Sequence, residues 1–399
     1  MNNPSYPTIT IKPKRQESIL RRHPWVFSGA IKKIEGKPGA GDWVKVIANK
    51  GALLGWGHFS PGTSIAIRML TFATDKPDDA WWLSKIKEAV SVREMLGLIE
   101  SDSNNTCRLV HAEGDGLPGL IADFYAGVLV IQCHTPGMHN VIKLLSKAFA
   151  EALGDKLVAV YDKSSKALAK HGGVVSENGV VWGKMPEKHF ATEHGNKFNI
   201  DWEQGQKTGF FIDQRENRKL LGHYSKDKKV LNVFSYTGGF SIYAMKAGAK
   251  EVHSLDSSAR ALEVCEENVA LNDLNLDEHK SLQEDAVAFL KTDLSEYDII
   301  VLDPPAFAKR ASARHNAVQG YKRINLRAIK SMKPGSLLFT FSCSQAVDEK
   351  LFTNTIIAAS IQANRTVRIL HRLTQPADHP VSAFHPEGAY LKGLVLRVD

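Results

Sequence analysis

Residues 230–240 read VLNVFSYTGGF, an apolar strand that runs into a polar turn with two consecutive glycines. From there to the C-terminus strands and helices alternate: YDIIVLDPPAF and SLLFTFSCS read as strands, ARALEVCEENVALNDL (259–274) and AVAFLKTDL (286–294) as helices. Such alternation is typical of a parallel sheet with helices on both faces, in which ligands bind outside the carboxyl ends of the strands. This part of the chain therefore predicts an α/β, Rossmann-like domain.

Two other regions precede this domain in the 399-residue chain. Residues 1–75 contain short strand-like segments bounded by Gly and Pro, such as DWVKVIA and LLGWGHF, which predict a small all-β domain. Residues 76–188 open with a helical pattern near Asp79 and then mix strands and helices, which predicts a central α/β domain. The third region, residues 189–399, begins with a hairpin-like segment ahead of the alternating pattern.

The positive charge of the chain is unevenly distributed. Residues 1–75 hold eleven Lys/Arg and four Asp/Glu, so they carry most of the net charge of +8. A basic module indicates a polyanionic partner, most often nucleic acid, although a solvated basic face is the alternative. In the segment RRHPWVFSGAI, Arg21 and Arg22 could contact phosphates, and Trp25 and Phe27 could stack on bases unless one or both are core residues.

Cysteine usage and the N-terminal sequence predict a cytoplasmic protein. The start, MNNPSYPTITIKPKRQ, lacks the apolar segment of a signal peptide, and no apolar run is long enough to span a bilayer, so no membrane partner is expected. The four cysteines form no CxxC pair, which disfavours a zinc knuckle or a disulfide scaffold. His379 and His385 lie in a Pro-rich loop without metal-ligand company, so we expect no metal site.

The turn after the first strand and two later acidic residues predict a nucleoside cofactor. Glycines let the backbone approach a ligand, and the helix that follows offers free N–H groups. Asp256 ends the second strand and could accept both ribose hydroxyls, while Asp285 ends the third and could accept from an adenine amino group; either could instead be a helix N-cap. Neither GxGxxG nor GxxxxGK[ST] is present, which favours S-adenosylmethionine over a dinucleotide or a nucleoside triphosphate. The predicted cofactor loop comprises Phe234, Ser235, Tyr236, Thr237, Gly238, Gly239 and Phe240.

Asp303 and Cys343 predict the reacting groups. Asp303 ends the fourth strand before two prolines that stiffen the turn, and Cys343 ends the fifth strand between two serines. If these strands are neighbours, both residues face one pocket. A thiolate that adds to C6 of cytosine makes C5 nucleophilic enough to accept a methyl group, with an acid acting at N3. A helix N-terminus after Ser344 could lower the pKa of the thiol.

The other three cysteines show no such placement. Cys107 and Cys133 fall in strand patterns and Cys265 lies in mid-helix, far from any strand end. Free cysteines most often behave as small apolar residues of the core. We therefore interpret these three as structural.

These motifs, together with DGLPGL, EHG, KTGFFIDQR, GYKRIN, ADHP and EGAYLKG, occur in an order that resembles the bacterial 23S ribosomal RNA large subunit methyltransferase I family. The resemblance covers nearly the whole chain. It implies an N-terminal PUA RNA-binding domain, a central α/β domain and a class I methyltransferase domain that uses S-adenosylmethionine to make 5-methylcytosine in ribosomal RNA. Within that domain it implies Cys343 as the catalytic cysteine and Asp303 as the motif aspartate, and it places Asp213 and Gln214 beside the cofactor.

One position departs from the family pattern, which often reads DPPKF where this chain has Ala306 in DPPAF. If the missing lysine contacts RNA phosphate, Lys309 and Arg310 could compensate for it. Two other functions stay open. One is methylation of an exocyclic amine, guanine N2 or adenine N6, which needs no thiol; the other is a non-catalytic RNA-binding assembly factor. Homodimerisation is a further option that the sequence leaves open.

Overall fold

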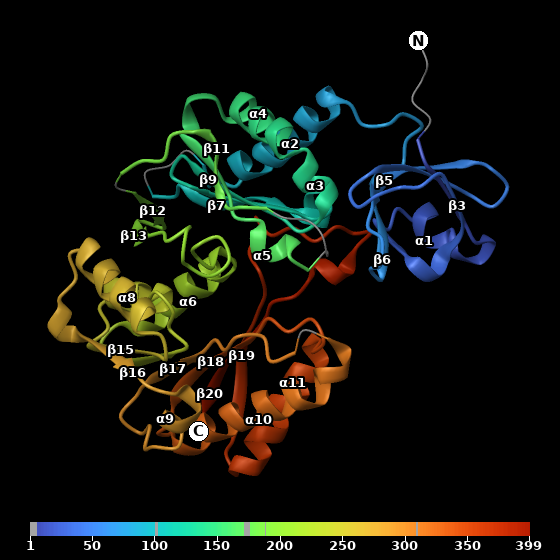
Figure 1. Ribbon diagram of the computed structural model, residues 1–399. Coiled ribbons are helices and arrows are strands. Elements are labelled where there is room, and N and C mark those ends of the chain that lie inside the picture. Colours follow the sequence, from blue (N-terminus) through green and yellow to red (C-terminus); the bar gives the residue numbers. More distant parts are fainter. Residues whose placement is uncertain (1–5, 100–102, 171–175, 188, 309) are drawn as a thin grey trace. The chain divides into compact units, whose positions relative to one another are not determined.

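The computed structural model describes residues 6–99, 103–170, 176–187, 189–308 and 310–399, and the chain divides into two compact units (Figure 1). The first unit comprises Met1–His189, Ile200–Phe210 and Ala377–Gly388. The second comprises Phe190–Asn199, Phe211–Pro376 and Ala389–Asp399. Two short segments, 200–210 and 377–388, thus leave the second unit and return to the first. The predicted domain limits at residues 75 and 188 stay a prediction.

A six-stranded sheet begins the first unit. Its strand order is β2-β6-β5-β4-β1-β3, and only the β1–β4 pair is parallel. In β4 the side chains of Val44 and Val46 are buried and alternate with partly buried neighbours, the pattern of a strand with one face on a core. The strands are β1 (Thr8–Ile11), β2 (Trp25–Phe27), β3 (Ile31–Glu35), β4 (Trp43–Ile47), β5 (Leu53–Phe59) and β6 (Ile65–Thr71), with α1 (Glu17–Leu20) between β1 and β2.

A five-stranded sheet with helices completes the first unit, in the order β11-β10-β9-β8-β7. Its first helix begins at Asp79, as expected, because the Asp78 carboxylate accepts the Trp81 N–H at 2.8 Å and caps it. Cys107 and Cys133 are fully buried strand residues, which confirms their structural interpretation. The elements are α2 (Asp79–Met95), β7 (Thr106–His111), β8 (Leu120–Tyr125), β9 (Val128–Cys133), α3 (Pro136–Asn140), α4 (Ile142–Leu153), β10 (Ala159–Asp162), α5 (Ser165–Leu168) and β11 (Gly179–Gly183).

The second unit contains a seven-stranded sheet in the order β16-β15-β14-β17-β18-β20-β19. The first five of these strands are parallel and β20 is antiparallel to both of its neighbours, so the predicted alternation is confirmed. The strands are β14 (Lys229–Val233), β15 (Glu251–Asp256), β16 (His279–Gln283), β17 (Ile299–Leu302), β18 (Ser336–Ser342), β19 (Val367–Leu373) and β20 (Lys392–Val398). A hairpin of β12 (Phe190–Glu193) and β13 (Asn196–Asn199) precedes them.

Helices cover both faces of this sheet. Figure 1 shows α10 and α11 on one side and α6 and α8 on the other. On the first side, buried residues of α10 and α11 form one hydrophobic cluster with Leu231, Leu302 and Leu338 of the sheet. The helices are α6 (Arg215–Ser225), α7 (Gly239–Lys246), α8 (Ala259–Leu271), α9 (Ala286–Phe289), α10 (Arg314–Ser331) and α11 (Glu349–Ala363).

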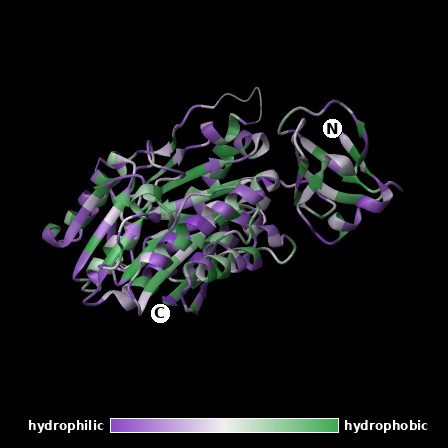
Figure 2. Cartoon of the chain, turned by 90° about the horizontal axis from the view of Figure 1, so that it is seen from below, coloured by the Kyte–Doolittle hydropathy of each residue, from purple (hydrophilic) through white to green (hydrophobic). Residues whose placement is uncertain are grey.

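The predicted helix over residues 286–294 is shorter in the structure, where α9 ends at Phe289. Four residues further on, the Asp293 carboxylate accepts hydrogen bonds from the backbone N–H and the hydroxyl of Ser295, an interaction that competes with a continuing helix. Among the described residues, no helix is long and apolar enough to cross a membrane. Figure 2 shows hydrophilic residues interspersed with hydrophobic ones along the ribbon.

A buried ionic cluster joins the β12–β13 hairpin to α6 and α7. The Glu193 carboxylate, with no exposed surface, accepts three N–H···O bonds of 2.7–2.9 Å from the Arg218 guanidinium. It also accepts the Tyr243 hydroxyl at 2.9 Å, and Nε of Arg215 lies 3.6 Å away. Arg218 in turn donates to the Phe211 carbonyl at 2.8 Å, which fixes the segment that leads into α6. One carboxylate therefore holds three separate elements of the second unit.

Removing this carboxylate is expected to destabilise the second unit. Glu193→Ala leaves the buried Arg218 without its counter-charge, so we expect a loss of about 3–5 kcal/mol in the free energy of unfolding. Urea unfolding followed by far-UV circular dichroism measures it. Glu263→Ala, at an exposed glutamate of α8, is the matched control and should change stability by less than about 0.5 kcal/mol. Equal stabilities for the two variants would contradict the role given to Glu193.

Candidate active site

The strand order of the seven-stranded sheet reverses at β14. The chain continues from β14 to β15 on one side of it, and later returns to β17 on its other side. In sheets of this kind, ligands bind where the strand order reverses. β17 and β18 are direct neighbours, as the sequence-based prediction required, with Leu302 opposite Thr340. Asp303 and Cys343, which follow these two strands, therefore emerge at the same edge of the sheet.

The loop after β14 has an unusual backbone. Phe234 and Tyr236 adopt φ values of 63° and 48°, a left-handed region that is uncommon for residues other than glycine. The Tyr236 N–H donates to the Asp256 carboxylate at 3.0 Å, which holds the loop against the end of β15. At Gly238 (φ 79°) an added Cβ would lie 2.3 Å from Sγ of Cys265, so glycine is required there and Cys265 is a packing residue. Strained backbone of this kind is concentrated at functional sites.

Two hydroxyls in this loop fit a bound polar ligand. Ser235 and Thr237 are almost fully buried, and their hydroxyl oxygens have no hydrogen-bond partner among the residues that the structure describes. Buried polar groups in native proteins are nearly always satisfied, so such orphans call for a ligand or water. The adjacent first turn of α7, at Gly239 and Phe240, adds the N–H groups of a helix N-terminus. The carboxylate of an S-adenosylmethionine molecule offers matching acceptors for all of these donors.

The two acidic residues after β15 and β16 differ in their surroundings. Asp256 is partly buried and accepts backbone N–H groups from Tyr236 and Ser258, at 3.0 and 2.9 Å. Asp285 is exposed and caps α9, because its carboxylate accepts the Ala288 N–H at 2.7 Å. Asp285 is therefore the N-cap of α9, which was the alternative to a role in binding adenine. Its second carboxylate oxygen can still accept a hydrogen bond from a ligand. The ribose and adenine roles of these residues stay predictions.

Asp303 lies in a group of polar side chains contributed by three segments. Its carboxylate accepts an N–H from Gln214 at 3.1 Å, and Gln214 is fixed by a 2.6 Å hydrogen bond from Asn217. Asp213 accepts the Tyr390 hydroxyl at 2.6 Å. Burial and the nearby Asp213 charge raise the pKa of Asp303 to about 7, against the opposing effect of the Gln214 hydrogen bond. A carboxyl group with this pKa can donate a proton at neutral pH.

Cys343 is partly exposed, whereas Cys107, Cys133 and Cys265 are buried. It lines a pocket of about 190 Å³ together with Ala306, Ala308, Gln345 and Tyr390. Tyr390 also donates to Asp213, so one side chain connects this pocket with the polar group around Asp303. A larger hollow of about 560 Å³ lies on the six-stranded sheet, but its lining of Ser, Thr, Pro, Gly and apolar residues offers no comparable chemistry.

Ser344 connects the loop after β18 to the loop after β17. Its buried hydroxyl accepts the Ala308 N–H at 3.2 Å and lies 2.9 Å from the Tyr321 hydroxyl. Its carbonyl accepts Nζ of Lys392 at 2.8 Å. These contacts fix the backbone on both sides of the pocket, so the position of Cys343 is set by packed backbone.

The predicted helix N-terminus after Ser344 lies further along the chain. α11 begins at Glu349 and is capped by the Asp348 carboxylate, which accepts the Leu351 N–H at 2.8 Å. The capping residue decides where the helix starts, because its side chain satisfies an N–H group that the helix leaves open. The helix therefore begins five residues beyond Ser344, and the effect of its N-terminus on the thiol stays a prediction.

Lys392 is a candidate functional residue that the sequence-based reasoning missed. It is 9% exposed and lies opposite Ser342 in the β18–β20 pair. Burial lowers the pKa of Lys392 to about 8, while the Cys343 thiol and Asp348 oppose this effect. The sequence EGAYLKG contains no pattern that places this lysine near Cys343, because β20 pairs with β18 only in the folded sheet.

The residues predicted to bind RNA lie in different settings. Arg21 is highly exposed, and the Arg22 guanidinium lies 5.8 Å from the centre of the Phe384 ring. Trp25 is partly buried, packs against the His385 ring at 4.4 Å and donates its indole N–H to Glu113 at 2.7 Å. Phe27, by contrast, is half exposed. Arg310 is exposed, and Lys309 lies outside the described residues.

Comparison with known families agrees with this architecture. Residues 107–397 match the family model of the S-adenosylmethionine-dependent methyltransferases, and residues 9–72 match that of the PUA-like domain. Two proteins named ribosomal RNA large subunit methyltransferase I are similar over nearly the whole chain. The one from Tolumonas auensis is 39% identical over 98% of this chain and 99% of its own length. The one from Salmonella typhi is 38% identical over 99% and 98%.

Solved structures show the same fold at low sequence identity. A protein assigned as a SAM-dependent methyltransferase from Streptococcus mutans superposes with a TM-score of 0.82 at 19% identity, covering 98% of this chain and 99% of that chain. A methyltransferase structure complexed with SAH gives 0.83 over the same shares, also at 19% identity. The predicted fold, a PUA-like β domain followed by α/β regions and a methyltransferase domain, is confirmed, and so is S-adenosylmethionine as the cofactor.

The raised pKa of Asp303 has a consequence for stability that can be measured without cofactor. The pKa of Asp303 is about 7 in the folded protein, which is above its value in the unfolded chain. The folded protein therefore loses stability as the pH rises from the unfolded-state pKa to the folded-state pKa. Asp303→Asn has no charge to form, so it avoids this loss of stability. The free energy of unfolding of the variant minus that of wild type should therefore be larger at pH 8 than at pH 5, by on the order of 2 kcal/mol.

Urea unfolding of the full chain at the two pH values measures this difference. Asp277→Asn, at an exposed aspartate, is the control and should stay within about 0.5 kcal/mol of wild type at both. If the gain of Asp303→Asn is the same at pH 5 and pH 8, the carboxyl group titrates normally and the argument for a proton on Asp303 fails.

Proposed function

The chain belongs to the ribosomal RNA large subunit methyltransferase I family, and from this premise we propose that it methylates C5 of a cytosine in large-subunit ribosomal RNA. One observation carries the proposal beyond the family name. A partly exposed cysteine lines a pocket at the end of β18, beside the strand that ends in a carboxyl group of raised pKa. Addition to cytosine requires a thiol and a proton donor, and the two strands that these residues follow are neighbours in the sheet.

In the proposed reaction, the Cys343 sulfur forms a bond to C6 of the base while the Asp303 carboxyl gives its proton to N3. The electron pair of the C5–C6 double bond then makes C5 nucleophilic. S-adenosylmethionine, when bound, would supply the electrophilic methyl group and leave as S-adenosylhomocysteine. A base removes the C5 proton, the bond between sulfur and C6 breaks to restore the thiolate, and N3 returns its proton to Asp303. The pKa of about 7 suits Asp303 to this task, because a carboxyl group with an ordinary pKa would hold no proton at neutral pH.

The cofactor would be held by the loop after β14. We assign its carboxylate to the buried hydroxyls of Ser235 and Thr237 and the first turn of α7, its ribose to Asp256 and its adenine to the neighbourhood of Asp285. Tyr236 and the glycines shape this loop. Asp213 and Gln214 hydrogen-bond Tyr390 and Asp303 and so position them, while contact of Asp213, Gln214 and Asp303 with the cofactor stays a prediction.

RNA contact is assigned to basic side chains of both units. The exposed Arg21 and Arg310 can neutralise phosphates, and the half-exposed Phe27 offers a ring for stacking. Arg22, Lys309 and the packed Trp25 stay predictions for the same role. A large-subunit ribosomal RNA substrate implies a cytoplasmic enzyme. Homodimerisation stays a prediction.

Nucleoside mass spectrometry tests the reaction. Unmodified large-subunit ribosomal RNA is incubated with S-adenosylmethionine and wild type, Cys343→Ala or the control Cys133→Ala, which removes a buried thiol of the first unit. We expect 5-methylcytidine with wild type and with the control, and a loss of at least about 10³-fold with Cys343→Ala, because the covalent route is closed.

Other outcomes would support the alternative functions. Appearance of a methylated guanosine or adenosine that survives Cys343→Ala would point to exocyclic-amine chemistry, for which the thiol is idle. Cofactor binding without methylation of any RNA tested would favour the assembly factor. Either result would overturn the thiol mechanism.

Lys392 is proposed as the cation that stabilises the Cys343 thiolate. Lys392→Met removes the charge, so alkylation of Cys343 by iodoacetamide near pH 7 should slow several-fold, whereas Lys392→Arg should retain most of the rate. Because Lys392 itself loses its proton around pH 8, the difference between wild type and Lys392→Met should narrow above that pH. Mass spectrometry of the peptide that contains Cys343 reports the rate. If the alkylation rates of wild type and Lys392→Met differ by the same factor at every pH, an electrostatic role for this lysine is excluded.

A further inference from the structure

His385 is a buried histidine whose ring lacks hydrogen-bond partners. The residue is 3% exposed, and neither Nδ1 nor Nε2 has a partner within the part of the chain that the structure describes. A neutral imidazole has one nitrogen with a free lone pair, and this is the form that binds a metal ion. Buried imidazole nitrogens are normally satisfied, and an ion is one way to satisfy them.

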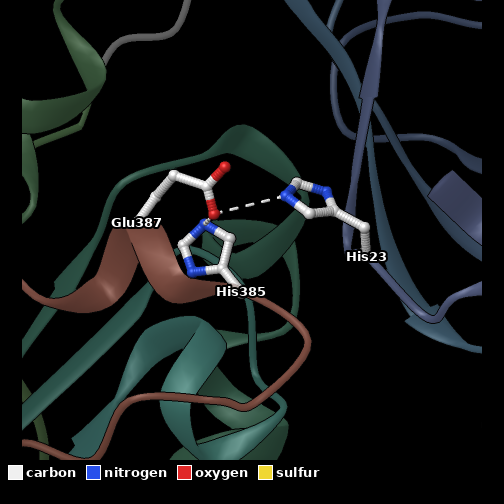
Figure 3. Close-up of side chains that lie close together, drawn as sticks. All are labelled: His23, His385 and Glu387. Carbon is white, nitrogen blue, oxygen red and sulfur yellow. Dashed lines mark hydrogen bonds and ion pairs between the residues drawn. The ribbon is translucent and has the colours of Figure 1, made fainter.

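Two further metal-ligand side chains surround this ring (Figure 3). Oε2 of Glu387 lies 3.9 Å from Nε2 of His385 and 3.4 Å from Nε2 of His23. The ligand atoms of all three residues lie within 4.8 Å of one another. All three residues belong to the first unit, although His23 and Glu387 are 364 positions apart in the chain. This separation is why the sequence-based reasoning found no metal-ligand company for His385.

The donor set has the chemistry of a zinc-type site. Two imidazole nitrogens and one carboxylate oxygen are ligands that zinc takes in tetrahedral sites that keep a fourth position for water. The half-exposed Glu387 side chain supplies the carboxylate oxygen of this set.

Neighbouring groups hold the rings in place. The His385 ring packs edge-on against Trp25 at 4.4 Å and lies 5.4 Å from the His23 ring. Nδ1 of His23 accepts the backbone N–H of Trp25 at 3.2 Å, which leaves the ring proton on Nε2, facing Glu387. An ion that binds Nε2 takes the place of that proton, which moves to Nδ1 in exchange for the Trp25 contact. Nε2 of His23 and Nε2 of His385 lie 3.4 and 3.9 Å from Oε2 of Glu387, so both ring nitrogens can reach one ion there.

From this geometry we propose that His23, His385 and Glu387 form a binding site for one divalent transition-metal ion of the zinc type. The ion would join the loop that contains His385 to the turn before β2. The ion would take no part in methyl transfer, since the site contains none of the groups assigned to that reaction. The proposal is therefore independent of the reaction proposed above, and its test needs no activity measurement.

Zinc binding to the metal-stripped full chain tests the proposal, by competition with a chromophoric chelator at pH 7.5. His385→Phe keeps a ring against Trp25 but removes the ligand nitrogens, and Glu387→Gln keeps the shape of an exposed side chain but removes its charge. His315→Ala, at an exposed histidine of α10, is the matched control. We expect one zinc ion per chain with wild type and with the control, and at least about tenfold weaker binding with each of the other two variants.

A second measurement guards against a folding defect. Zinc should raise the melting temperature of wild type and of His315→Ala, and should raise that of His385→Phe and Glu387→Gln less, because only binding to the folded state stabilises it. Far-UV circular dichroism checks that each variant folds. The proposal is overturned if wild type binds less than one zinc ion per chain, or if all four proteins bind zinc equally, which would indicate adventitious binding at surface histidines.

Discussion

The buried Glu193 carboxylate is the interaction on which the catalytic half of the molecule depends. It holds Arg218 of α6 and Tyr243 of α7 from the β12–β13 hairpin, and Arg218 fixes the Phe211 carbonyl at the entrance to α6. That entrance contains Asp213 and Gln214. A charge pair with no exposed carboxylate surface tolerates little displacement, because any movement would leave a charge desolvated and unpaired. The position of the residues around Asp303 is therefore set by an ion pair that takes no part in the chemistry.

The same packing gives Asp303 its chemical character. Burial, and after it the charge of Asp213, raises the pKa of Asp303 to about 7, at which the carboxyl group can both hold and give a proton at neutral pH. Such an arrangement is less stable than an uncharged one. Sites that need a proton at neutral pH commonly carry this kind of penalty, and the stability of the surrounding fold offsets it.

Hydrogen bonds between side chains and backbone define the pocket beside Cys343. Ser344 bonds to the loop after β17 through its hydroxyl and to Lys392 through its carbonyl. The departure at Ala306 falls on this pocket, where a methyl group takes the place of a longer side chain. The geometry near the thiol is therefore a property of three strand ends, β17, β18 and β20, that meet only after the sheet has formed.

The sequence by itself determined the alternation of strands and helices, the strand-end positions of Asp256, Asp303 and Cys343, and the family to which they point. These are local signals, since periodicity, glycines and turn residues act over a few positions. Only the tertiary structure decided that Lys392 lies beside Cys343 and that His23 meets His385. The physical reason is that burial and charge depend on neighbours brought together by folding, and no local pattern records which distant segments become neighbours.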